Sequence, residues 1–171
     1  MRRLAVAAVL ATVLAGCSSP DPFAAYRLSE AEEVPGSFDW SMVPPEDVAP
    51  AIDAAEAYRR LPGAGEEPMA TVALGRVRYE VDGSVGPTAW LFVTPHLCFA
   101  TAKGDLVSPG RFGDGDGCTD DNLYVQGVDA TTGEVLGGFS AFDTVEGWTP
   151  ARAGTPAPVE VRTQEGTTRL H

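Results

Sequence analysis

Cys98 has the most chemically versatile side chain in the middle of the sequence, and His96 stands two positions before it. Side chains two positions apart on an extended chain point to the same side, so His96 is placed to act as a base for a Cys98 nucleophile. Cys118, twenty positions after Cys98, offers a different chemistry, a disulfide bond. The two interpretations compete, because a sulfur held in a disulfide is not a nucleophile.

A dense acidic stretch surrounds Cys118 and places four carboxylates within eight residues: Asp114, Asp116, Asp120 and Asp121. Loops of this kind bind calcium where they supply about six to eight oxygen ligands at fixed positions. The calcium-loop register fails here, because placing Asp114 third puts Phe112 first and Leu123 twelfth, and neither side chain can bind a cation. We therefore expect a solvated acidic loop, with weak calcium binding through the four aspartates as the alternative.

Other catalytic signatures are missing from the sequence. It contains none of the motifs G-x-S-x-G, S-x-x-K, G-x-x-x-x-G-K and H-E-x-x-H, which mark several hydrolases and phosphate-binding proteins. The adjacent Glu66 and Glu67 are interpreted as a loop charge pair and not as the two carboxylates of a glycosidase. Trp40 is interpreted as a packed side chain, with carbohydrate binding as the alternative. We expect no cofactor, and the sequence favours a protein that is not an enzyme.

The N-terminus indicates export. Arg2 and Arg3 are followed by thirteen uncharged residues, mostly Leu, Ala and Val, that end at Gly16. As a helix these residues would span roughly 20 Å, less than the roughly 30 Å of a hydrocarbon core. A positive start followed by a short apolar run is typical of a secretory signal peptide and not of a permanent transmembrane helix.

The end of this segment, Leu14-Ala15-Gly16-Cys17, resembles the lipobox of bacterial lipoproteins. The resemblance implies that Cys17 receives a diacylglycerol, that cleavage follows Gly16, and that an acyl chain is added to the new amino group. Each buried methylene contributes about 0.8 kcal/mol, so two or three acyl chains anchor a protein durably. We therefore predict a protein of the cell membrane, attached to the bilayer through Cys17 on the extracytoplasmic face.

Export also bears on the two remaining cysteines. An oxidising compartment favours a disulfide between the pair Cys98 and Cys118. Closing a loop of this length stabilises a fold by about 3 kcal/mol in the chain-entropy model. We predict a structural disulfide, with a reactive thiol as the less favoured alternative.

The charge balance excludes other partners. The chain has 12 Lys and Arg against 24 Asp and Glu, a formal net charge of −12. Loss of residues 1–16 removes two arginines and makes this −14. Nucleic-acid binding is excluded, because phosphate contacts need basic side chains. Anionic lipids would repel this surface, so the attachment to the membrane must come from the acyl chains.

The 171 residues divide into four expected parts. These are a signal peptide over 1–16, a lipidated N-terminus and tether over 17–45, an α+β domain over 46–146, and a mostly flexible tail over 147–171. The tether and the tail are rich in proline and small residues without a sustained hydrophobic period. Four aromatic residues nevertheless suggest that part of the tether packs on the domain: Phe23, Tyr26, Phe38 and Trp40.

The domain begins with helical periodicity and continues with the period of strands. The spacing of Val48, Ile52, Ala55 and Tyr58 predicts a helix over 46–61. Strands are predicted at 69–81, with a bulge or bend at Gly75-Arg76, at 89–93 as a central strand, at 123–129 and at 134–142, and a further edge strand is considered at 159–162. The expected fold class is α+β, with one helix packed on an antiparallel sheet of about four strands.

The last two strands of the domain are joined by a recognisable hairpin. The sequence from Gly127 to Leu136, GVDATTGEVL, resembles the D-A-x-T-G-E-V hairpin that closes PepSY-type domains of exported bacterial proteins. Asp129 would begin the turn, and Gly133 would supply its positive φ. The resemblance implies a cystatin-like fold and contact with a peptide or protease. It carries over no functional residue.

Three functions stay open at this point. The first is a lipid-anchored, non-catalytic module that contacts an envelope protein or peptide. The second is binding of a small ligand or calcium through the loop that runs from Cys98 to Asn122. The third is a hydrolase of unrecognised type that uses an aspartate or His96.

Overall fold

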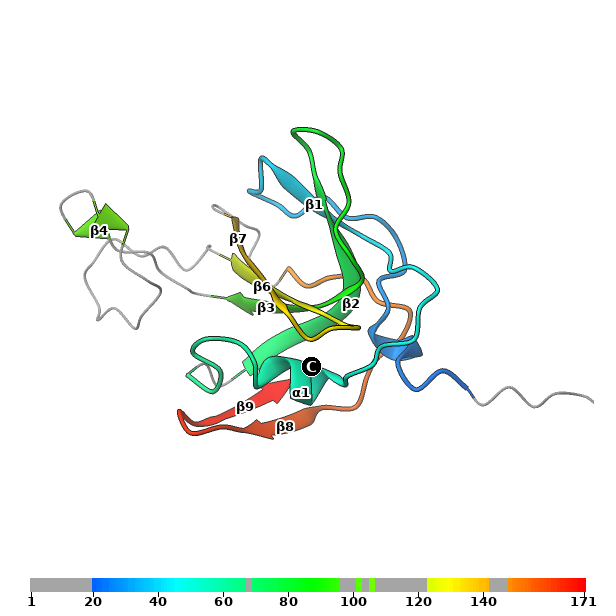
Figure 1. Ribbon diagram of the computed structural model, residues 1–171, viewed down its shortest axis with the longest axis vertical. Helices are drawn as coiled ribbons and strands as arrows, with labels where there is room; N and C mark the ends of the chain where they lie inside the picture. The colour runs from blue at the N-terminus through cyan, green and yellow to red at the C-terminus, as the bar shows by residue number, and fades with distance from the viewer. Residues whose placement is uncertain (1–19, 67–68, 96–100, 103–104, 107–122, 142–147) are drawn as a thin grey trace, which may run out of the picture.

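Seven strands of one mixed sheet dominate the computed structural model, which describes residues 20–66, 69–95, 101–102, 105–106, 123–141 and 148–171 (Figure 1). Six of the strands follow the order β7-β6-β3-β2-β9-β8, and β1 pairs with β2. The strands are β1 Trp40–Val43, β2 Met69–Tyr79, β3 Ala89–Pro95, β6 Leu123–Asp129, β7 Val135–Ala141, β8 Val159–Arg162 and β9 Thr167–Leu170. Two short strands, β4 Thr101–Ala102 and β5 Asp105–Leu106, pair with each other separately.

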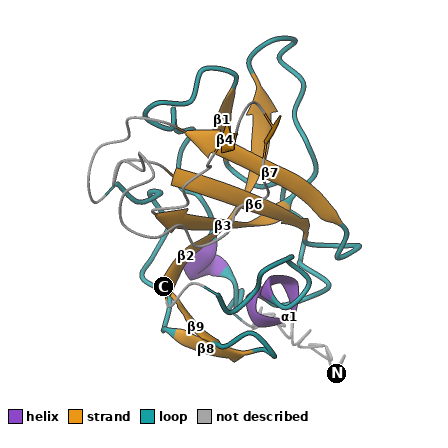
Figure 2. Cartoon of the chain, turned by 90° about the vertical axis from the view of Figure 1, so that its left-hand side faces the viewer, coloured by secondary structure: helices purple, strands orange, loops and turns teal. Residues whose placement is uncertain are grey.

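The expected fold class, one helix on an antiparallel sheet of about four strands in a cystatin-like arrangement, is wrong. Seven strands share the sheet, and β9 runs parallel to β2. The helical content of the described residues is a single turn of 3-10 helix, η1 Ala24–Tyr26, and one α-helix of five residues, α1 Ala54–Tyr58 (Figure 2). The additional strands come from the segments that were expected to be tether and tail.

The helix is shorter than the predicted 46–61 because the chain before it bonds elsewhere. The backbone N–H groups of Ala51 and Ile52 both donate to the carbonyl of Ala130, at 2.8 and 3.4 Å. Asp53 then caps the helix, since its Oδ1 accepts a hydrogen bond of 2.7 Å from the Glu56 N–H. The apolar residues that predicted the helix are therefore divided between α1 and the segment that precedes it.

The segment expected to be a tether is largely part of the fold. It contains η1 and β1, and Leu28 and Val34 are buried. The segment expected to be a flexible tail contains β8 and β9, in which Val161 and Leu170 are each 1% exposed. The edge strand considered at 159–162 is confirmed as β8.

The change of periodicity inside β2, which was expected to mark a bulge or bend, coincides with a change of partner strand. Residues Thr71 to Gly75 of β2 pair with β3, whereas Arg76 to Tyr79 pair with β1. The strand therefore changes its main neighbour at Gly75-Arg76. Side chains of both parities are buried, because each face of the sheet has its own core.

The central strand predicted at 89–93 is confirmed as β3, which lies between β2 and β6. Trp90 and Phe92 face the core that includes α1, whereas Leu91 and Val93 face the opposite core. All four side chains are at most 2% exposed. A continuous apolar run is what a strand with two covered faces requires.

The β6–β7 hairpin also has the predicted geometry. The Oδ1 of Asp129 accepts hydrogen bonds from the N–H groups of Thr131 and Thr132, at 2.7 and 2.8 Å. Gly133 has a φ of 73°, which favours glycine. A Cβ at this position would also overlap the guanidinium of Arg60. The hairpin therefore packs against Arg60, close to α1, and also connects β6 to β7.

Candidate functional site

Most of the residues singled out from the sequence lie outside the described residues: Cys17, His96, Cys98, Cys118, Asp114, Asp116, Asp120 and Asp121. The lipidation, disulfide and calcium predictions therefore stay predictions. Glu66 is described and exposed, whereas its neighbour Glu67 is not described. The described residues form other surface features.

Trp40 is packed, as one of its two interpretations held. Trp40 is 6% exposed, and its ring centroid lies 5.4 Å from that of Phe139. Its indole Nε1–H donates a hydrogen bond of 3.1 Å to the carbonyl of Ser140 in β7. Trp40 therefore joins β1 to β7 across the curled sheet and offers little ring surface to a carbohydrate.

The curl of the sheet encloses a small cavity, which we call the apolar hollow. Its volume is about 90 Å³, and its lining combines β2, β6, β7, the first residue of β3 and the chain before it: Val77, Tyr79, Gly86, Pro87, Ala89, Gly127, Leu136 and Phe139. Gly86 and Gly127 contribute no side chain, which leaves the space open. A Cβ at Gly127 would make ordinary contacts of 3.6 Å with Leu136 and 3.7 Å with Leu91.

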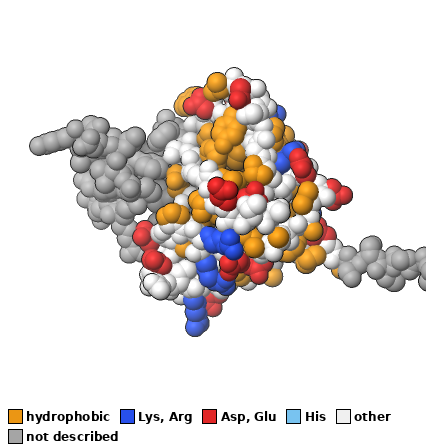
Figure 3. Space-filling model, in the orientation of Figure 1, with side chains coloured by type: hydrophobic (Ala, Val, Ile, Leu, Met, Phe, Trp, Pro, Cys, Tyr) orange, Lys and Arg blue, Asp and Glu red, His pale blue; other side chains and the backbone are white. Residues whose placement is uncertain are grey.

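Exposed apolar side chains stand on the turns beside the apolar hollow. Tyr79 and Val85 are 40% and 43% exposed, and Val81 and Phe38 are each 85% exposed. The two turns are joined, since the Glu80 N–H donates to the carbonyl of Asp39 at 2.9 Å. Figure 3 shows hydrophobic side chains gathered over the upper part of this face, where β1, β2 and β7 lie in Figure 1. Apolar patches of this kind on a protein surface mark interaction sites.

The same turns carry negative charge. Hydrogen bonds from the Ser84 hydroxyl and N–H lower the pKa of Asp82 below its ordinary value. The Ser41 hydroxyl, 2.6 Å from Glu80 Oε1, lowers the pKa of Glu80, and Arg78 adds to this effect. Both carboxyl groups are therefore ionised at neutral pH. The charge of Glu80 is paired with Arg78, at 3.0 Å, so Asp82 supplies the negative charge at the rim of the apolar hollow.

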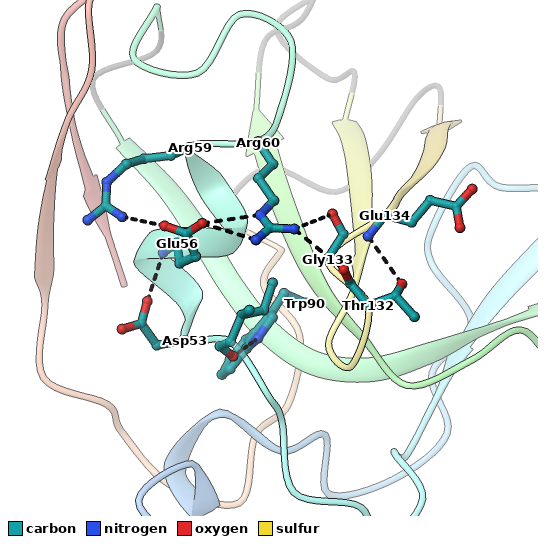
Figure 4. Close-up of polar contacts among 9 residues, drawn as sticks. Asp53, Glu56, Arg59, Arg60, Trp90, Thr132, Gly133 and Glu134 are labelled. Atoms are coloured by element: carbon teal, nitrogen blue, oxygen red, sulfur yellow. Dashed lines mark hydrogen bonds and ion pairs between the residues drawn. The ribbon is translucent and has the colours of Figure 1, made fainter.

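A second cavity, the aromatic pocket, lies where the N-terminal segment crosses α1. Its volume is about 230 Å³, and its lining is Pro22, Phe23, Tyr26, Asp53, Ala54, Ala55, Trp90 and Val159. The rings of Phe23 and Tyr26 stand edge-on to Trp90, with centroids 5.6 and 5.4 Å away. The indole Nε1–H of Trp90 donates 2.9 Å to the carbonyl of Ile52, which fixes the ring beneath the pocket (Figure 4).

Tyr26 is electrostatically coupled to the charges near the aromatic pocket. Burial raises the pKa of its hydroxyl above the ordinary value, the negative charge of Asp53 raises it further, and the positive charge of Arg152 opposes both. The hydroxyl is therefore protonated at neutral pH and can donate a hydrogen bond. Aromatics in the presumed tether were the sequence signal for this pocket, but their partners Asp53 and Trp90 were not foreseen.

A polar network attaches α1 to the β6–β7 hairpin. The guanidinium of Arg60 lies 3.1 Å from Glu56 Oε1 and donates 3.1 Å to the carbonyl of Gly133 (Figure 4). Arg59 forms a second ion pair with Glu56, at 3.0 Å. These contacts hold the helix turn in place and leave Asp53 at its N-terminal end, facing the aromatic pocket.

Within the described residues, no group of three or more His, Cys, Asp and Glu side chains is arranged to hold a metal ion. The described helices are also too short or too polar to cross a bilayer. No protein-family model, curated protein or solved structure shows a significant match to this chain.

Proposed function

We propose that this protein is a lipid-anchored, non-catalytic protein of the cell envelope that binds a segment of a partner protein or peptide in the apolar hollow. The observation that carries the proposal is a cavity of about 90 Å³ beside exposed apolar side chains and an acidic rim. Ligand sites for drug-sized molecules have volumes of about 300–1,000 Å³. The apolar hollow fits part of one aliphatic side chain, as in a protein contact.

The charge of the rim defines the partner further. Asp82 is held ionised on the turn beside the opening, Glu80 is paired with Arg78, and the whole chain has a net charge of −12. Complementary charge steers association and selects partners. The fitting segment therefore presents an aliphatic side chain next to Lys or Arg residues.

Lipid anchoring rests on the residues Leu14 to Cys17 and on the short apolar run before them. A protein held at the membrane meets its partner at a high effective concentration. An affinity in the micromolar range would then be sufficient for a stable encounter, which agrees with the small size of the apolar hollow.

A displayed library of random peptides tests the proposal on the purified protein. We expect enrichment of sequences with one aliphatic residue flanked by Lys or Arg. Val81→Lys, which places a positive charge on the turn beside the opening, and Gly127→Ala, which fills part of the apolar hollow without a clash, should each lower the affinity for the best peptide about tenfold or more, equivalent to about 1.4 kcal/mol.

Val48→Lys provides the matched control, because Val48 is also an exposed valine, at 40%, and does not line the apolar hollow. It should leave peptide affinity unchanged. Absence of any enriched motif, or equal loss of affinity with the control and the two site variants, would contradict the proposal.

A further inference from the structure

We propose that the aromatic pocket binds an ammonium group, either the cationic head group of a lipid or a free quaternary amine. The pocket is separate from the apolar hollow, with which it shares no lining residue. Its lining combines the partly exposed rings of Phe23 and Tyr26, the buried ring of Trp90 beneath them, and Asp53. Aromatic faces together with a negative charge are the features that recognise ammonium ions.

The rings are held in a fixed arrangement. Phe23 and Tyr26 meet the ring plane of Trp90 at 76° and 84°, respectively. Trp90 is fully buried and forms the base, while Phe23 and Tyr26 are partly exposed and form the walls. A cation attracted to an aromatic face lies within about 6 Å of the ring centroid. The cavity, of about 230 Å³, has room for a trimethylammonium group beside the rings that line it.

Asp53 supplies the negative charge. It is the one charged residue among the described residues that line the aromatic pocket. Its Oδ1 caps α1 by accepting from the Glu56 N–H, and in the described part of the chain no hydrogen bond to its Oδ2 is found. One carboxylate oxygen is thus available to a ligand, and the capping bond keeps the group in place.

The neighbouring cations are engaged elsewhere. The Nε of Arg27 lies 2.7 Å from Asp21 Oδ2, and its other nitrogens donate to the carbonyls of Glu46 and Val48. The Nη1 of Arg152 donates 3.2 Å to the carbonyl of Val72. Neither arginine lines the aromatic pocket, although the positive charge of Arg152 reaches Tyr26 and opposes the effect of Asp53 there.

The location favours a lipid head group, and this step rests on the proposed lipid anchor. Pro22 lines the aromatic pocket and lies five residues after Cys17. A fully extended chain covers at most about 3.6 Å per residue, so about 18 Å separates the acylated residue from the pocket at most. The pocket would therefore lie close to the head groups of the leaflet that holds the acyl chains.

Calorimetric titration of the full protein in uncharged detergent tests the proposal. The probe is choline, and its uncharged isostere 3,3-dimethylbutanol is the reference. We expect choline to bind and the isostere to bind at least about tenfold more weakly. Asp53→Asn keeps a residue that caps helices well and should weaken choline about tenfold, whereas Asp47→Asn, at an exposed acid outside the pocket, should change nothing.

Micelles containing phosphatidylcholine distinguish the two possible sources of the ammonium group, a lipid head group and a free quaternary amine. Competition with choline by phosphatidylcholine and not by phosphatidylglycerol assigns a lipid head group, whereas choline binding without such competition assigns a free amine. No measurable choline binding, or equal binding of choline and its isostere, overturns the proposal. Val81→Lys should leave choline binding intact, so failure of the apolar hollow is distinguishable from failure of this pocket.

Discussion

At the scale of single residues, Gly133 and Gly83 have the same backbone conformation but different surroundings. Their φ angles are nearly equal, at 73° and 70°. A Cβ at Gly83 would meet nothing within 4 Å, whereas a Cβ at Gly133 would overlap Arg60. Substitutions at the two positions can therefore separate two costs. One is the intrinsic strain of a positive φ, and the other is the displacement of the side chain that joins α1 to the hairpin.

We predict that Gly83→Ala lowers the free energy of unfolding by about 1 kcal/mol, the cost of left-handed backbone for a residue with a Cβ. Gly133→Ala should cost at least about 2 kcal/mol more, because Arg60 must also give up its bond to the Gly133 carbonyl. Urea denaturation of both variants measures the difference. Equal losses would contradict the role given to Arg60.

Glu32 is a residue whose ionisation opposes folding. Burial raises the pKa of its carboxyl above 4.5, the neighbouring Glu30 raises it further, and the hydrogen bond from the Ala151 N–H opposes both. Because the folded pKa lies above the unfolded one, the stability linked to the neutral form is fully present below pH 4.5 and is lost as the pH rises through the folded pKa.

We therefore predict that Glu32→Gln, which keeps an acceptor for Ala151, stabilises the protein at pH 7 relative to the wild type and has little effect at pH 4. The measurement is the free energy of unfolding at a series of pH values. Glu33→Gln, at an exposed neighbour, controls for the general loss of one negative charge. A gain that does not grow with pH would refute the linkage.

At the scale of elements, the sequence predicted the strands and turns whose signals are local. The run from Ala89 to Val93 predicted β3, and Asp129 with Gly133 predicted the β6–β7 hairpin. The strand β9 was missed because its stability comes from a partner far along the chain: Ala70 pairs with Leu170. Thr, Gly and Pro dominate its neighbourhood, and the residue pattern alone resembles a tail.

The candidate sites escaped sequence reasoning for a related reason. The apolar hollow exists because the sheet curls until Trp40 of β1 reaches Ser140 of β7. The aromatic pocket requires Phe23 and Asp53 to meet above Trp90. Cavities depend on how distant segments pack, whereas motifs depend on spacing within one segment. Most of the candidate site residues that the sequence singled out, such as Cys98 and Cys118, lie outside the described part of the chain.

The short helix α1 depends on its contact with β9. The hydroxyl of Tyr58 is 2.9 Å from Thr168 Oγ1 in β9, and it accepts a hydrogen bond of 3.2 Å from the Gly65 N–H. Tyr58 is 4% exposed, so these bonds are made away from water. A helix of five residues has little intrinsic stability and must obtain it from such packing.

We predict that Tyr58→Phe, which keeps the ring against Phe92, lowers the free energy of unfolding by about 1–2 kcal/mol through the loss of buried hydrogen bonds. Tyr79→Phe, at a tyrosine that is 40% exposed, should cost less than about 0.5 kcal/mol. Thermal or urea unfolding measures both. A neutral Tyr58→Phe would show that α1 does not depend on this contact.

At the scale of the whole molecule, the C-terminal strands decide whether the domain is one cooperative unit. β9 lies alongside the first residues of β2, and the backbone of His171 exchanges hydrogen bonds with Ala70 and Val72. Val161 of β8 and Leu170 of β9 belong to the same core as Trp90 and α1. This core also forms the floor of the aromatic pocket, so the pocket depends on residues at the far end of the chain.

A chain that ends at Pro158 distinguishes a structural C-terminus from a flexible tail. Loss of a tail would leave unfolding unchanged. Loss of β8 and β9 exposes the core next to α1, and we expect the truncated protein to lose cooperative unfolding. Leu170→Ala is the milder version, expected to cost about 2–5 kcal/mol for a buried leucine, with Thr167→Ala at an exposed position of the same strand as its control. If both the truncation and Leu170→Ala left the unfolding midpoint unchanged, β9 would not be part of the cooperative core.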